Sequence, residues 1–131
     1  MAFTKDEATV KLKEWADAME VMDDTADFQE ACETLCMAVM RERLAFNDED
    51  RSFSLKLFDP IQMDKSRIEL IKIRRISVDE MRVAERYTEK EKVSSSEAVI
   101  AKACGLKLAE SSKLMDKDIA TIGCVRSTFF V

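Results

Sequence analysis

The sequence predicts a mainly α, α+β fold, in which an N-terminal helical hairpin or arm is followed by one short antiparallel β-hairpin and then three short helices. Only two glycines and one proline occur in 131 residues, so few tight turns are available for a many-stranded sandwich or barrel. Apolar residues recur at helical spacing behind Ser/Thr-x-x-Glu capping boxes. In one central stretch the spacing changes to alternation, which is typical of strands.

The first 46 residues predict an acidic helical arm. Thr4 and Glu7 form a capping box that opens the first helix. Asp24 or Thr25 is suited to cap a second helix, and the two helices are able to form a hairpin. Because two helices alone bury little apolar surface, their seams are also a candidate dimer surface. The apolar stripes behind the two caps are Ala8, Leu12, Trp15, Met19 and Met22, and then Phe28, Cys32, Leu35 and Val39.

A polar break, FNDEDRS at residues 46–52, separates this arm from a second predicted domain at 53–131. Apolar and polar residues alternate on both sides of a short connection, which favours an antiparallel hairpin. The predicted parts are a strand from Phe53 that ends at Asp59-Pro60, a turn at 62–66, and a second strand through Ile68, Ile71 and Ile73.

Residues 71–86, IKIRRISVDEMRVAER, predict a corner where the second strand ends and a helix begins. Ser77 and Glu80 form a capping box there, so the Ser77 hydroxyl is needed as a helix cap rather than as a kinase site. A nucleic-acid surface is the competing interpretation, but acidic residues alternate with the basic ones and no aromatic side chain lies among them. The basic residues of this corner are Arg74, Arg75, Arg82 and Arg86.

Two further helices follow the corner helix. Ser94 and Glu97 form a third capping box, which opens a short alanine-rich helix. Gly105 stands where a C-terminal glycine cap is expected. Residues 106–115 predict a loop with one helical turn, and Asp116 is suited to cap the last helix.

The residue inventory excludes several kinds of site. The chain has no histidine, which removes histidine bases, Ser-His and Cys-His nucleophile pairs, and histidine metal ligands. Cys32 and Cys36 share one helix face, but they lack the short CxxC spacing that indicates zinc, so we interpret them as small apolar residues. No Gly-rich phosphate loop or HExxH motif occurs. We therefore expect a protein that is not an enzyme and needs no cofactor.

Charge is divided unevenly along the chain. Residues 1–50 carry 14 acidic and 5 basic side chains, a net charge of −9, whereas residues 51–131 carry 12 acidic and 16 basic, a net charge of +4. This division predicts contact between the two halves or between subunits, and a homo-oligomer. A nucleic-acid partner is not favoured, because DNA-binding domains are usually strongly basic. No apolar run approaches the roughly 18 residues that a membrane span needs, so we expect no membrane partner.

The C-terminal sequence RSTFFV places Phe129 and Phe130 together at a chain end. Two interpretations are open for them. They belong either to the core or to an exposed apolar contact for a partner.

Residues 53–122 resemble the phage tail assembly chaperones of long-tailed bacteriophages, the E/41/14 group. No single motif is specific, and the ordered set carries the resemblance. Ile76 stands where family members usually have proline, Cys104 stands where threonine is common, and the N-terminal arm lies outside the family pattern. The matching stretches are LKLFDPI (55–61), IELIKIRRISVDEMRVAE (68–85), AVIAKACGL (98–106) and LMDKDIA (114–120).

The resemblance implies a non-enzymatic chaperone that binds the phage tape-measure protein and keeps it soluble during tail tube assembly. It further implies a contact with the tail tube protein through a frameshifted longer form, a location in the cytoplasm of the infected bacterial host, and absence from the mature virion. A helical dimerisation or adaptor protein, or a small phage regulator with weak nucleic-acid binding, is the alternative. The candidate partner-binding residues are Arg74, Arg75, Arg82, Phe129 and Phe130.

Overall fold

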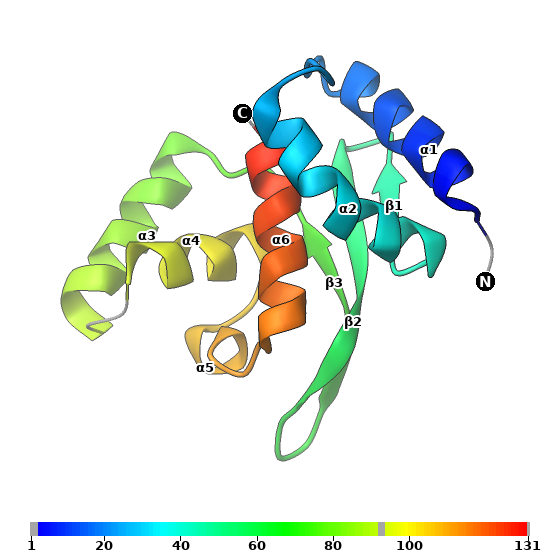
Figure 1. Cartoon of the computed structure of the whole chain (residues 1–131). Helices are drawn as coiled ribbons and strands as arrows, with labels where there is room; N and C mark the ends of the chain where they lie inside the picture. Colours follow the sequence, from blue (N-terminus) through cyan, green and yellow to red (C-terminus); the bar gives the residue numbers. More distant parts are fainter. Residues whose placement is uncertain (1–2, 92–93, 131) are drawn as a thin grey trace.

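A computed structural model describes residues 3–91 and 94–130 of the chain. The fold is mainly α with one antiparallel sheet, the class that the sequence predicts, and Figure 1 shows the helices α2 and α6 lying against the sheet. The elements in order are α1 (Lys5–Ala18), α2 (Ala26–Met40), β1 (Leu44–Asn47), β2 (Ser52–Gln62), β3 (Arg67–Ile73), α3 (Val78–Glu91), α4 (Ser95–Cys104), α5 (Leu108–Ser111) and α6 (Asp116–Phe129).

Helices α1 and α2 begin at the predicted caps. Thr4 and Glu7 make the reciprocal bonds of a capping box, and the Thr25 hydroxyl accepts the N–H of Phe28 at 3.2 Å. Both helices end without glycine, at Glu20 and Glu42, which adopt φ values of 56° and 57°. A left-handed residue usually satisfies the last helix carbonyls at such ends, and non-glycine residues pay a steric cost there.

The sheet has three strands in the order β1-β2-β3, one strand more than the predicted hairpin. The stretch 46–52 is the turn of an additional hairpin, in which Phe46 lies opposite Phe53 and Asn47 opposite Ser52. The Asn47 amide donates to the Ser52 hydroxyl at 3.1 Å. The turn also holds Asp50, which pairs with Lys72 on β3, so the acidic half and the basic half of the chain meet across the sheet.

Strand β2 does not end at Asp59-Pro60 but continues to Gln62. Its pairing with β3 is interrupted between Lys56 and Ile61, where the register shifts. Proline has no N–H to donate, so it is tolerated in a strand at such an interruption. The prediction of a strand end at the proline was therefore wrong, because a bulge carries the strand past it.

The later helices follow most of the predicted signals. Ser77 and Glu80 make both bonds of the capping box, at 3.0 and 3.1 Å, and Ser94 accepts the N–H of Glu97. The predicted loop over 106–115 contains α5, a single helical turn. Asp116 does not cap α6, because Met115 holds the cap position and Asp116 is the first helical residue.

One hydrophobic core contains residues from both of the predicted parts, 1–46 and 53–131. Aromatic rings join them: Trp15 of α1 meets Phe53 of β2 edge-on at 5.8 Å between ring centroids. Phe53 stacks on Phe129 of α6 at 4.7 Å, and Phe129 meets Phe28 of α2 at 6.3 Å. The first two helices are therefore packed on the sheet through the same rings that hold the C-terminal helix.

We expect alanine to have opposite effects at the two glycines. Gly105 ends α4 with φ at 65°, and Gly105→Ala should destabilise the fold by about 1 kcal/mol because an L side chain is strained there. Gly123 lies inside α6, and a methyl group added to it meets no atom within 4 Å, so Gly123→Ala should stabilise the fold by roughly 0.5 to 1 kcal/mol. Urea unfolding of both variants measures the two signs; a stabilised Gly105→Ala would contradict the left-handed cap.

Candidate functional site

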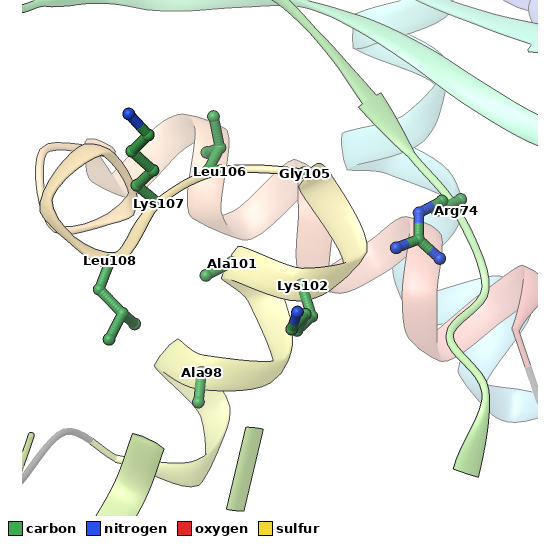
Figure 2. A pocket seen from close by; sticks show the side chains of 8 residues that line it. All are labelled: Arg74, Ala98, Ala101, Lys102, Gly105, Leu106, Lys107 and Leu108. Carbon is green, nitrogen blue, oxygen red and sulfur yellow. The ribbon is translucent and has the colours of Figure 1, made fainter. Parts of the chain in front are cut away.

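The candidate site is a groove between α4, the turn that follows it, and Arg74 at the end of β3. Its volume is about 400 Å³, and we call it the α4–α5 groove. Figure 2 shows the Arg74 side chain pointing toward α4. Ala98 and Ala101 are almost fully buried, so the groove has a floor of small side chains. The lining residues are Arg74, Ala98, Ala101, Lys102, Gly105, Leu106, Lys107 and Leu108.

Backbone hydrogen bonds fix the walls of the groove. The N–H of Arg74 donates to the carbonyl of Ala103 at 3.0 Å, which ties the end of β3 to α4. Gly105 turns the chain sharply after α4, and the Leu106 N–H closes this cap on the Ala101 carbonyl at 2.9 Å. The Lys107 N–H donates to the Glu110 carboxylate at 2.8 Å and so starts α5. These bonds hold Leu106 and Leu108 beside the alanines.

Electrostatics orient Arg74. Its Nη1 donates to Glu80 Oε1 at 3.0 Å, and its Nη2 also contacts the same carboxylate. The Arg74 hydrogen bonds, together with the Ser77 N–H, lower the pKa of Glu80 to about 2, and the pair raises the pKa of Arg74. The arginine is thus held at the groove as a charged group, with Lys102 and Lys107 as further basic lining residues.

The structure does not gather the other predicted partner-binding residues at this groove. Arg75 is exposed, and Arg82 pairs with Asp79 on α3 at 3.5 Å, as its helical spacing predicts. Phe129 is 1% exposed and belongs to the core, and Phe130 is half-buried with its ring 5.9 Å from that of Phe53. Arg74 pairs with the nearby carboxylate of Glu80 on α3.

Sequence reasoning missed the apolar part of the groove. The predicted caps at Ser94 and Gly105 gave the correct start and end of α4, the helix that forms one wall of the groove. Leu106 and Leu108 carried no signal of their own, because their role depends on the turn that places them beside α4.

The cysteines are packed as small apolar residues. Cys32 and Cys36 share a face of α2, with their sulfurs 3.5 Å apart, and all four cysteines are free thiols. Burial raises the pKa of Cys32, and raises that of Cys104 to about 12. Within residues 3–91 and 94–130 no group of three or more cysteine or carboxylate side chains is placed to hold a metal ion.

The chain matches no protein-family model, no curated protein and no solved structure with which it was compared. None of the helices in the described part of the chain is long and apolar enough to cross a membrane.

Proposed function

We propose that this chain is a non-enzymatic phage tail assembly chaperone, which binds the tape-measure protein and keeps it soluble while the tail tube assembles. The observation that carries the proposal is the α4–α5 groove, which combines an alanine floor with basic side chains at its edge. It lies on the segment of the chain that resembles the chaperone family. The resemblance and the groove are independent lines of support, one from the ordered sequence pattern and one from geometry.

The groove has the properties that an amphipathic client helix needs. Ala98 and Ala101 have small side chains that leave room for the groove, and at 0% and 4% exposure they lie beneath its surface. Leu106 and Leu108 supply apolar contact area beside that floor. Lys107 at the edge of the groove is exposed and suits an acidic residue on the flank of the client, and opposite charges at an interface raise the rate and the specificity of association.

The α3–α4 helix pair offers further apolar surface for a long client. Val78 and Met81 of α3 are 67% and 46% exposed. Methionine is unbranched and adaptable, so Met81 is able to repack on different turns of a repetitive helix. A client that runs along this pair would be covered by more than one chaperone copy. The same proposal places the protein in the cytoplasm of the infected bacterial host, outside the mature virion, with a longer frameshifted form for contact with the tail tube protein.

Leu108→Asp is expected to weaken binding of a tape-measure fragment by about 2 kcal/mol, because it introduces a charge into the apolar wall of the groove. Leu108 is the first residue of α5, where an acidic residue is compatible with the helix dipole, so the fold should remain. The matched control is Leu70→Asp on β3, since Leu70 is 63% exposed and does not line the groove.

The measurement is the soluble fraction of a co-expressed tape-measure fragment, followed by light scattering of the purified complex. Wild type and Leu70→Asp should keep the fragment soluble in a particle heavier than the chaperone alone, and Leu108→Asp should lose it. No gain in mass with wild type would refute the chaperone proposal. Equal loss with both variants would refute the groove as the client site.

The alternative, a small regulator that binds nucleic acid, has less support from the placement of the arginines. Arg74 is paired with Glu80 and Arg82 with Asp79, which cancels part of the positive field at this corner. Salt-sensitive retardation of nonspecific DNA in a gel would favour the regulator over the chaperone.

A further inference from the structure

A second groove lies at the C-terminal end of α2, where this helix meets β2 and the first turn of α6. The α1–α2 connection is at the other end of the helix. The volume of this groove is about 600 Å³, and we call it the basic groove. Four of its lining residues are cations and none is acidic. The lining residues are Met37, Arg41, Arg43, Lys56, Leu57, Phe58 and Lys117.

Phe58 is the apolar centre of the basic groove. Its side chain is 53% exposed, which is unusual for a phenylalanine on a sheet strand. Lys117 Nζ lies 4.0 Å from the centre of the ring, and the Arg43 guanidinium carbon lies 5.7 Å from it. Met37, 46% exposed, adds a second apolar side chain beside the cations. The groove thus offers an apolar contact surrounded by positive charge.

The positive charge of the groove is only partly compensated from within. The carboxylate of Asp118 lies beside Arg43, is fully buried and accepts the backbone N–H groups of Phe58 and Asp59. Arg43 Nη1 lies 4.0 Å from this carboxylate, beyond hydrogen-bond distance, and has no acceptor in the described part of the chain. Arg41, Lys56 and Lys117 make no ion pair with any described residue of the chain. Such a surface fits a ligand that brings carboxylates and an apolar side chain.

The connection between α1 and α2 has the complementary composition. Met22 is 67% exposed, the highest value, shared with Val78, among the large apolar side chains of the described chain. Glu20, Asp23 and Asp24 beside it are all exposed. We call these four residues the acidic knob. An exposed methionine beside exposed carboxylates is complementary in charge to an exposed phenylalanine beside cations.

The acidic knob is unable to reach the basic groove of its own chain. The knob precedes α2, and Met37, Arg41 and Arg43 lie at or beyond its other end. A helix of 15 residues is roughly 22 Å long, and α2 is held rigidly by its packing on α1 and α6. Figure 1 shows the α1–α2 connection and β1 at opposite ends of α2. Any knob that enters the basic groove therefore comes from another molecule.

We infer that the chain associates head to tail, with the acidic knob of one copy seated in the basic groove of the next. Met22 contacts Phe58 and Met37, and Asp23 and Asp24 face Arg41 and Lys56. Because the two surfaces differ, the contact is heterologous and repeats as an open filament or closes into a ring. This goes beyond client binding, since it uses neither the α4–α5 groove nor a tape-measure protein.

Two charge-reversed variants test the contact. Asp23→Lys with Asp24→Lys reverses the knob, and Arg41→Glu with Lys56→Glu reverses the groove; all four side chains are exposed, so the fold should remain. Sedimentation equilibrium at low salt measures the mass of each chain against concentration. Wild type should associate and should dissociate as salt screens the charges. Each variant should need at least about tenfold higher concentration, because like charges then face each other.

An equimolar mixture of the two variants is the decisive sample. In the mixture every reversed knob finds a reversed groove and every native knob a native groove, so association should return to the wild-type range. Lys65→Glu with Lys113→Glu makes the same charge change as the groove variant, away from both surfaces, and should associate as wild type does. A wild type that stays monomeric, variants that associate undiminished, or a mixture that stays dissociated would each overturn the inference.

Discussion

Asp118→Asn is expected to destabilise the folded chain by about 3 kcal/mol, because it disturbs the hydrogen bonds at the bulge of β2. Asp118 Oδ1 accepts the Phe58 N–H at 2.9 Å, and Oδ2 accepts the Asp59 N–H at 3.0 Å. Asparagine keeps one acceptor and turns an amide N–H toward the other backbone N–H. A buried donor that loses its acceptor costs about 1 to 3 kcal/mol, and the bonds lost here are to a charged group. Urea unfolding measures the change.

The bulge explains why two oxygens are needed at this position. Pairing of β2 with β3 stops between Lys56 and Ile61, so the N–H groups in this stretch need other acceptors. Asp118 satisfies Phe58 and Asp59, and Pro60 has no N–H. The carboxylate is the third residue of α6, where a negative charge is also favoured by the helix dipole.

Asp116→Asn is the matched control, since Asp116 lies two residues earlier in the same helix turn and is exposed; it should change the free energy of unfolding by less than about 0.5 kcal/mol. Arg43→Met separates the charge contribution. Asp118 keeps its two hydrogen bonds in that variant but loses the cation 4.0 Å away, and a buried carboxylate left without its partner charge should cost about 3 kcal/mol. An Asp118→Asn variant as stable as wild type would show that this carboxylate does not stabilise the bulge.

Helix starts were predictable from the sequence because their chemistry is local. Thr4, Thr25, Ser77 and Ser94 each bond a backbone N–H three residues later, and this spacing is visible in the sequence. The ends at Glu20 and Glu42 were not visible in the same way, because the usual glycine signal is missing there.

Features that depend on distant residues were not predictable. Strand β1 has four residues and lies directly after a helix, so it offers too few alternations to show a period, and its pairing with β2 gives it its structure. Asp118 bonds the backbone 60 residues away, and no local pattern in the sequence indicates such a bond. The basic groove likewise combines the end of α2, the bulge of β2 and the start of α6.

Phe129→Ala is expected to destabilise the fold by about 4 kcal/mol. Phe129 is 1% exposed, stacks on Phe53 at 4.7 Å and meets Phe28 edge-on at 6.3 Å. Truncating a buried phenylalanine removes its transfer free energy and leaves a cavity, at about 3 to 5 kcal/mol. Domains of this kind have a total stability of about 5 to 15 kcal/mol, so urea unfolding should show a large shift of the midpoint.

Matched phenylalanine-to-alanine substitutions decide between the two interpretations of the C-terminal aromatic residues. Phe130 is half-buried, so Phe130→Ala should lower the free energy of unfolding by about 1 to 2 kcal/mol. Phe58 is 53% exposed, so Phe58→Ala should lower it by less than about 1 kcal/mol. If the ring of Phe129 belongs to the core, stability falls in the order of burial, and loss of client binding follows from unfolding alone. A Phe129→Ala chain that keeps its unfolding midpoint and yet loses the tape-measure fragment would instead make Phe129 a partner contact, which requires the last turn of α6 to leave Phe28 and Phe53.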